Sequence, residues 1–107
     1  MRTIPQPGDI WFIDLGMVGK PRYALVLAAQ TDARLALASV VLITTQFAAT
    51  PYEVTLPRVP WLPEQSYINV QSLQPVKFTE FVRKAPGKFD ARVLSEVQTA
   101  LQTWLKL

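Results

Sequence analysis

"GKPRYALVLAAQ", residues 19–30, joins two positive charges to a continuous run of small and aliphatic side chains. The apolar part, residues 23–28, has no polar break, and such a run predicts a central strand that is buried on both faces. Gly19 and Pro21 restrain the turn in front of this strand. Arg22 is therefore expected at the mouth of the strand, carried by a rigid element.

Shorter strands are expected on both sides of this central one. A turn rich in Pro and Gly precedes the apolar segment 10–14, which predicts a first strand. The segment 38–44 is dominated by β-branched residues and predicts another. The segment 52–56 alternates in side-chain character between two prolines, which is typical of a short, half-buried strand.

The second half of the chain begins with an irregular stretch and ends in a helix. Residues 57–65 carry three prolines and predict a loop, whereas residues 66–76 and 78–84 predict two or three more short strands with a break at Pro75. After Phe89, apolar residues recur at helical spacing for about four turns. These residues are Val93, Leu94, Val97, Leu101, Trp104 and Leu105.

The start of this helix carries its own signals. Asp90 is the expected N-cap, and Phe89 before it is expected to pack on Leu94 as a hydrophobic staple.

Several short strands with short connections are hard to arrange as a parallel sheet. The sequence therefore predicts one domain, residues 1–107, of mainly β class: a small antiparallel barrel with a C-terminal α-helix over part of its face.

The composition excludes several kinds of site. The chain of 107 residues has no cysteine and no histidine, so thiol nucleophiles, disulfides, histidine bases and sulfur or imidazole metal sites are excluded. Its carboxylates are scattered singly, and we expect no metal and no cofactor. The net charge of +3 permits an anionic partner such as nucleic acid. No export signal or apolar run of about 18 residues is present, so a cytoplasmic protein without a membrane partner is expected.

Two polar segments could form a site if the sheet brings them together. Arg22 has a guanidinium that forks onto two phosphate oxygens, and Thr44, Thr45 and Gln46 gather hydroxyls and an amide at the end of the strand 38–44. If that strand is the antiparallel neighbour of the central one, Arg22 and Thr44 converge. The structural alternative is a solvated charge at a strand end beside threonines that simply favour strands.

Two aromatic residues, Trp61 and Tyr67, lie in or beside the proline-rich loop. Bases of single-stranded RNA stack on exposed rings of this kind. The rings could equally pin the loop to the body of the protein or form a subunit interface. The sequence leaves these interpretations open.

The order of these pieces resembles the MazF/PemK family of toxin endoribonucleases. The resemblance covers nearly the whole chain, and it rests on the following segments in order: PGDIWFIDL, KPRYALVLA, VVLITTQ, YEVTLP, SYINVQSLQPV and FDARVLSEVQTALQTWLKL. Its most specific parts are the PGDIW start, an Arg that opens an apolar strand, and the IT pair followed by a small residue and Gln.

The resemblance implies an SH3-like barrel that forms a homodimer, cleaves single-stranded RNA without metal and is neutralised by a cognate antitoxin. Cleavage in the family proceeds by attack of the ribose 2′-hydroxyl on the adjacent phosphorus. By position, Arg22 and Thr44 match the family's catalytic Arg and Thr. The residues expected to bind RNA are Lys20, Tyr23, Thr45, Gln46, Trp61 and Gln71.

Three departures from the family pattern concern activity. The loop before Arg22 is shortened and has no acid or hydroxyl, Tyr23 follows the Arg in place of the usual Pro, and Leu73 stands where many members have Arg. Tyr23 is either a proton donor or stacking ring, or a residue that fills the strand edge. The alternative function is therefore a toxin-like barrel without catalysis that binds DNA gyrase or nucleic acid.

An acidic antitoxin peptide would find an anchor in Trp61 of the Pro-rich loop.

Overall fold

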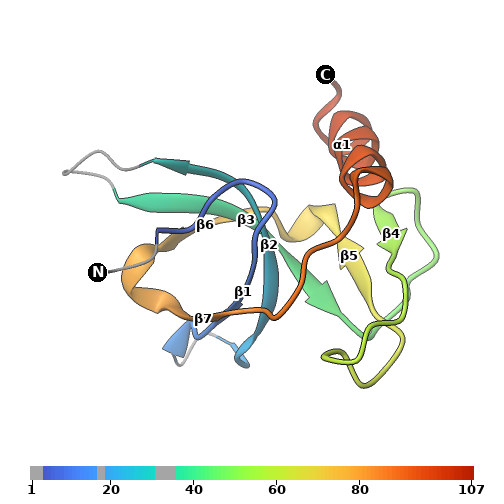
Figure 1. Ribbon diagram of the computed structural model, residues 1–107. Helices are drawn as coiled ribbons and strands as arrows, with labels where there is room; N and C mark the ends of the chain where they lie inside the picture. The colour runs from blue at the N-terminus through green and yellow to red at the C-terminus, as the bar shows by residue number, and fades with distance from the viewer. Residues whose placement is uncertain (1–3, 17–18, 31–35) are drawn as a thin grey trace.

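The computed structural model describes residues 4–16, 19–30 and 36–107 (Figure 1). These residues form a sheet of seven strands, two 3-10 helices and one α-helix. The elements are β1 (Ile10–Ile13), β2 (Arg22–Gln30), β3 (Leu37–Thr44), β4 (Glu53–Thr55), β5 (Tyr67–Asn69), η2 (Val70–Ser72), β6 (Gln74–Lys77), η3 (Phe78–Glu80), β7 (Phe81–Lys84) and α1 (Ala91–Leu105).

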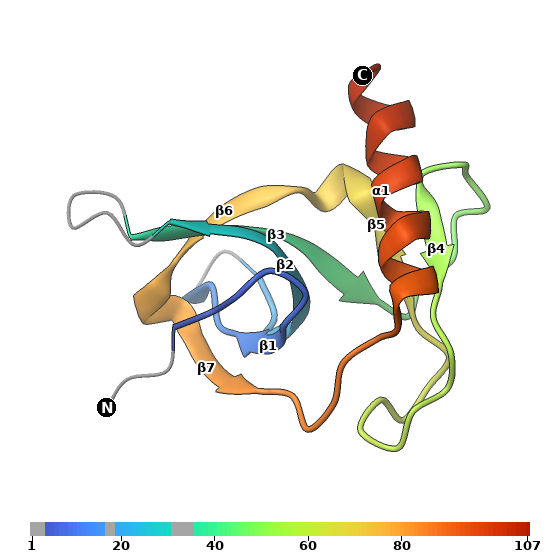
Figure 2. The same cartoon turned by 45° about the horizontal axis from the view of Figure 1, so that its top comes forward.

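Every strand pairing is antiparallel, and the order along the sheet is β4-β5-β3-β2-β1-β7. β2 runs along one edge of β3, while β6 and then β5 pair with its other edge. Figure 2 shows the sheet curling around β1, with β4 and β5 at the opposite end of the molecule next to α1. The predicted mainly-β fold with one C-terminal helix is confirmed; the sheet is barrel-like and is not closed within the described residues.

The central strand separates two apolar clusters. Leu25 packs into one cluster with residues of β3, β4, β5 and α1, whereas Ala24 and Val26 pack into the other beneath β1 and β6. Both faces of this first part of β2 are buried, as predicted. The prediction of burial over residues 23–28 is wrong at its end, because Ala28 is exposed. The strand also continues further than predicted, to Gln30, which is exposed as well.

α1 begins as its sequence indicates. The Asp90 carboxylate accepts a hydrogen bond from the Val93 backbone N–H at 3.1 Å, which confirms the N-cap. Phe89 and Leu94 both pack against the same core cluster. The helix buries Val93, Val97 and Ala100 on one stripe.

The predicted stripe on α1 needs correction at its C-terminal end. Trp104 and Leu105 are 39% and 45% exposed, because the sheet beneath the helix ends before them. Trp104 packs edge to face on Tyr52, with 5.1 Å between ring centroids. Within the described part of the chain, no helix is long and apolar enough to cross a membrane.

The predicted strand break at Pro75 is wrong. The chain breaks earlier, at η2, and Pro75 lies inside β6 opposite Ser39 of β3. β6 pairs with β3 alone in the described sheet, so it is an edge strand. Proline is tolerated there because its missing N–H faces no neighbouring strand.

Asp9 is a charged residue in the core, 1% exposed. Its carboxylate accepts hydrogen bonds from the Gln6 backbone N–H at 2.9 Å and the Trp11 indole at 3.4 Å. Lys88 and Lys84 approach the other oxygen at 3.3 Å and 3.5 Å. Burial alone would raise the pKa of Asp9, but these donors and cations together lower it. The carboxylate thus ties the first turn to β7 and to the segment that leads into α1.

Candidate functional site

Arg22 and Thr44 lie opposite each other on neighbouring strands. β2 and β3 pair Ala24 with Leu42, and the same register continued by two residues sets Arg22 across from Thr44. Residues directly opposite in an antiparallel pair carry their side chains on the same face. The predicted pairing of the two strands is confirmed, and it brings the two candidate catalytic residues together.

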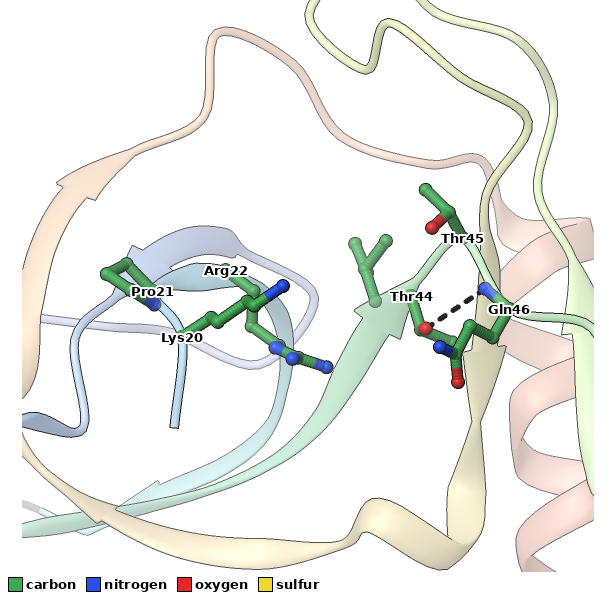
Figure 3. Close-up of a pocket in the computed structure, with 7 residues that line it drawn as sticks. Lys20, Pro21, Arg22, Thr44, Thr45 and Gln46 are labelled. Carbon is green, nitrogen blue, oxygen red and sulfur yellow. Dashed lines mark hydrogen bonds between the residues drawn. The ribbon is translucent and has the colours of Figure 1, made fainter. Parts of the chain in front are cut away.

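These two side chains line an open hollow of about 290 Å³ at the ends of the two strands. Figure 3 shows the Arg22 guanidinium extended toward Thr44 and Gln46, with the Lys20 ammonium nearby. Thr45 completes the lining from the β3 side. No ion pair engages Arg22 within residues 4–16, 19–30 and 36–107, so its charge is available to an anion.

The hydroxyl of Thr44 is oriented by the chain that follows it. The Gln46 backbone N–H donates a hydrogen bond to Thr44 Oγ1 at 3.1 Å (Figure 3). This bond uses an acceptor lone pair and leaves the hydroxyl hydrogen free to donate. Thr44 is therefore prepared to donate to an oxygen of an anion held by Arg22.

Two smaller hollows adjoin the first, and Arg22 and Thr44 line both of them. One, of about 220 Å³, is also lined by Glu53, Asn69 and Ser72 on the same sheet face. The other, of about 150 Å³, reaches the opposite face, and its lining includes Tyr23, Leu62, Glu64 and Ser66. Arg22 and Thr44 thus lie where three hollows adjoin, and the three hollows together are called the groove below.

Glu53 organises the loop after β3. Its two carboxylate oxygens accept the backbone N–H groups of Ala48 and Thr50, each at 2.7 Å, and the Thr50 hydroxyl donates at 3.1 Å. The two backbone hydrogen bonds, above all that from Ala48, lower the pKa of Glu53. A carboxylate that is so occupied and so acidic is a poor proton acceptor, and Glu53 acts here as a loop anchor.

Tyr23 and Trp61 belong to a cluster of aromatic rings. The Tyr23 ring meets Phe12 and Trp61 edge to face, with centroids 5.1 Å and 5.2 Å away. Trp61 also packs on Phe89 at 5.7 Å, and it does not line the three hollows. Trp61 pins the Pro-rich loop to the body, which was the structural alternative for this residue, and its contact with RNA stays a prediction.

Gln71 and Leu73 lie away from the hollows. Gln71 is exposed in η2, where its backbone N–H donates to Asn69 Oδ1 at 2.9 Å. Leu73 packs against the core cluster, which accounts for an apolar side chain at this position. The role of Gln71 in RNA binding stays a prediction. Part of the short loop before Arg22, residues 17–18, lies outside the described structure.

Three residues that the sequence did not indicate line the groove: Glu53, Asn69 and Glu64. Glu53 and Asn69 are opposite each other in the pairing of β4 with β5, and Glu64 comes from the Pro-rich loop. They come from three separate segments of the chain, and no local pattern marks them. Among the residues that the structure describes, no three metal-ligating side chains of the His, Cys, Asp or Glu type gather. The arrangement offers cations and hydroxyls, which suit a phosphodiester.

Comparison with known proteins shows the family of the chain. Residues 6–105 match the family described as PemK-like, MazF-like toxin of type II toxin-antitoxin system. No curated protein sequence matches the chain.

Among solved structures, MazF from Deinococcus radiodurans superposes with a TM-score of 0.80 at 22% identity, covering 99% of this chain and 100% of that one. An endoribonuclease in complex with its cognate antitoxin from a mycobacterial species gives 0.79 at 23% identity, with 96% of each chain covered. The Mycobacterium tuberculosis toxin MazF-mt6 gives 0.78 at 22% identity, over 92% of this chain and 97% of that one. These likenesses show the fold, and the family match extends over nearly all of the sequence. The chain belongs to the PemK-like, MazF-like toxin family of type II toxin-antitoxin systems.

Proposed function

We propose that the protein is a metal-independent endoribonuclease that cleaves single-stranded RNA at the Arg22–Thr44 groove. The observation that carries this proposal is the placement of Arg22 and Thr44 across two paired strands, in a hollow that Lys20 also lines. A guanidinium without a carboxylate partner in the described residues attracts phosphate, and a hydroxyl free to donate lies opposite it.

The reaction that suits these groups is internal transesterification. The ribose 2′-hydroxyl gives its proton to a base and its oxygen attacks phosphorus, while the bond from phosphorus to the 5′-oxygen breaks. The departing 5′-oxygen takes a proton from water, and a 2′,3′-cyclic phosphate is left on the upstream fragment. Arg22 stabilises the charge that develops on the non-bridging oxygens, and Thr44 donates a hydrogen bond to one of them. Both groups stand on paired strands, so their alignment is fixed before RNA binds.

We propose that the Glu64 carboxylate takes the proton of the 2′-hydroxyl. It lines the recess that also includes Arg22 and Thr44, and it is exposed. Within the described residues no hydrogen bond or ion pair engages its carboxylate oxygens. Glu53, in contrast, is engaged by the loop that it anchors.

The proposal includes the protein's partners. The related mycobacterial endoribonuclease has been solved with its cognate antitoxin, and a Deinococcus radiodurans relative has been solved as MazE-MazF. We propose a homodimer neutralised by an antitoxin whose acidic segment covers the cationic groove. We propose that the protein acts in the cytoplasm, where messenger RNA is accessible.

The test is cleavage of a mixed single-stranded RNA in the presence of excess chelator. Wild-type protein should give discrete cuts, and Arg22→Ala should slow them by about 10²–10³-fold, as expected for loss of one preorganised donor. Thr44→Val should slow cleavage while Thr44→Ser retains it, because Ser keeps the hydroxyl. Arg92→Ala is the matched control, since Arg92 is an exposed arginine on α1, paired with Glu96.

Uncut RNA, or cuts that do not depend on Arg22, would refute the nuclease. RNA that binds without being cut would instead support the toxin-like barrel without catalysis. Trapped gyrase–DNA complexes after induction in cells would support the gyrase form of that alternative.

A further inference from the structure

We infer that Phe47 and Tyr67 form a stacking platform for one RNA base next to the phosphate held by Arg22. This inference rests on the proposed ribonuclease function and adds to it a determinant of how the substrate is positioned. Neither ring is part of the lining of the three hollows, so the platform extends the groove along the sheet.

The two rings are already stacked, and one of them is open to solvent. Their centroids are 4.8 Å apart and their planes are inclined by 26°. Phe47 is 58% exposed, one of the most exposed large apolar side chains in the described structure. A phenylalanine that packs on one ring and leaves its remaining surface in water presents a flat apolar surface to a ligand.

The platform lies in the same row as the proposed catalytic pair. Thr44 of β3 is paired with Tyr67 of β5, and Arg22 is across from Thr44 on β2. Side chains paired in this way lie on one face, with Cβ atoms about 4.5–5.5 Å apart. A nucleotide with its phosphate at Arg22 therefore has the Tyr67 and Phe47 rings one strand beyond Thr44.

The loop that carries Phe47 is held in place before any ligand arrives. Glu53 accepts the backbone N–H groups of Ala48 and Thr50 at 2.7 Å each, directly after Phe47. Ala49 between them adopts a left-handed backbone with φ of 58°, a conformation that this double anchor supports. The backbone after Phe47 is thus held by the chain itself and the ring already stacks on Tyr67, so ordering it on binding costs little.

A nucleic-acid base suits this surface better than an apolar protein segment does. Lys20 and Arg22 beside it attract a polyanion, and the hydroxyls of Thr44 and Thr45 line the same groove. Stacking on an aromatic ring tolerates any base because every base has a flat π-face. The platform should therefore require that a base is present at one position without selecting its identity.

The test pairs a protein change with an RNA change. Once the cut site in an oligoribonucleotide is mapped, each nucleotide beside it is replaced in turn by an abasic residue, and kcat/KM is measured. For wild-type protein, one abasic position should lower kcat/KM about tenfold, the usual effect of losing a stacked base. Phe47→Ala should cause the same loss on intact RNA and no further loss on that abasic RNA. Phe47→Trp should retain activity.

Control variants separate the platform from general effects. Val82→Ala changes another exposed apolar residue, 55% exposed on β7, and should behave as wild type. Glu53→Gln weakens the anchor of the loop and should lower kcat/KM on intact RNA, with a smaller loss on the abasic RNA. Thermal unfolding of each variant shows that it is folded.

Three results would overturn the inference. In the first, Phe47→Ala cuts intact RNA as fast as Val82→Ala does. In the second, Phe47→Ala lowers kcat/KM on the abasic RNA by the same factor as on intact RNA, and in the third, Phe47→Ala changes the oligomeric state of the protein. The same oligonucleotides are also tested for binding by fluorescence anisotropy. A wild-type protein that binds but does not cut would refute the nuclease alone, while the abasic penalty on binding still tests the platform.

Discussion

Asp9→Asn tests whether the buried Asp9 carboxylate stabilises the fold by joining the first turn to β7 and to the segment before α1. The Asp9 side chain is 1% exposed, whereas those of its partners Lys84 and Lys88 are 43% and 57% exposed. Asparagine keeps the shape of the residue but removes its charge. It also places an amide N–H₂ in a site whose neighbours, the Gln6 N–H and the Trp11 indole, are donors.

Two losses add up in this variant. Hydrogen bonds to a charged acceptor contribute about 1.5–3 kcal/mol and neutral ones about 0.5–1.5 kcal/mol, so two bonds lose roughly 2 kcal/mol. Ion pairs with half-exposed lysines contribute less than about 1 kcal/mol each after solvent screening. We expect the free energy of unfolding to fall by about 3 kcal/mol. For a domain of this size, Tm should drop by about 15 °C.

The effect should depend on pH in a defined direction. The pKa of Asp9 in the folded protein lies below its ordinary value of 3.8. The stability that Asp9 provides is therefore fully present above about pH 4, and it is lost as the pH falls through the lowered pKa. The difference in Tm between wild type and Asp9→Asn should be constant near neutral pH and should shrink in acid.

Urea and thermal unfolding followed by circular dichroism measure both effects. Asp14→Asn is the matched control, because Asp14 is exposed and accepts a hydrogen bond from the Gly16 N–H within its own turn. An Asp9→Asn protein as stable as Asp14→Asn at neutral pH would refute the reasoning. So would a difference that grows as the pH is lowered.

Three further predictions concern the groove and the helix. Glu64→Gln should lower kcat while leaving KM for RNA unchanged; a rise in KM alone would count against Glu64 as the proton acceptor. Tyr23→Phe should retain cleavage and Tm, because the ring packs on Phe12 and Trp61; a large loss of kcat would show that its hydroxyl transfers a proton. Asp90→Ala should destabilise the protein by about 1 kcal/mol in urea unfolding, and Asp90→Ser, which keeps a cap, should recover most of it.

The elements that could be predicted from the sequence are those in which the spacing of apolar residues shows which face is buried. The central strand followed from a continuous apolar run, and α1 followed from a period of about 3.6 residues with Asp90 as N-cap. The facing pair Arg22 and Thr44 could be predicted as well, because each stands at a strand terminus and a single assumption about pairing brings them together. That assumption is confirmed.

Other features depend on register or on tertiary contacts, which no local pattern reveals. Glu53 reaches the groove through the pairing of β4 with β5, and its loop-anchoring role depends on a turn that folds back on it. The prolines around Trp61 left open whether its ring is exposed, and the structure packs this ring against Phe89 and Tyr23. Asp9 carries no local sign of burial, because the lysines that face its carboxylate come from distant β7 and the segment beyond it.

The side chains of the groove keep their relative positions because buried residues hold the strands that carry them. On β2, Leu25 is buried in the core, and its neighbour in the alternation, Tyr23, packs on Phe12 and Trp61. This packing fixes the backbone at Arg22 without using the face on which Arg22 projects. On β3, Ile43 is buried next to Thr44 in the same way. Changes at the buried side chains of either face, such as Leu25 or Val26, should therefore displace the cation and hydroxyl of the groove together, whereas changes at Arg22 and Thr44 themselves should alter RNA handling and leave folding intact.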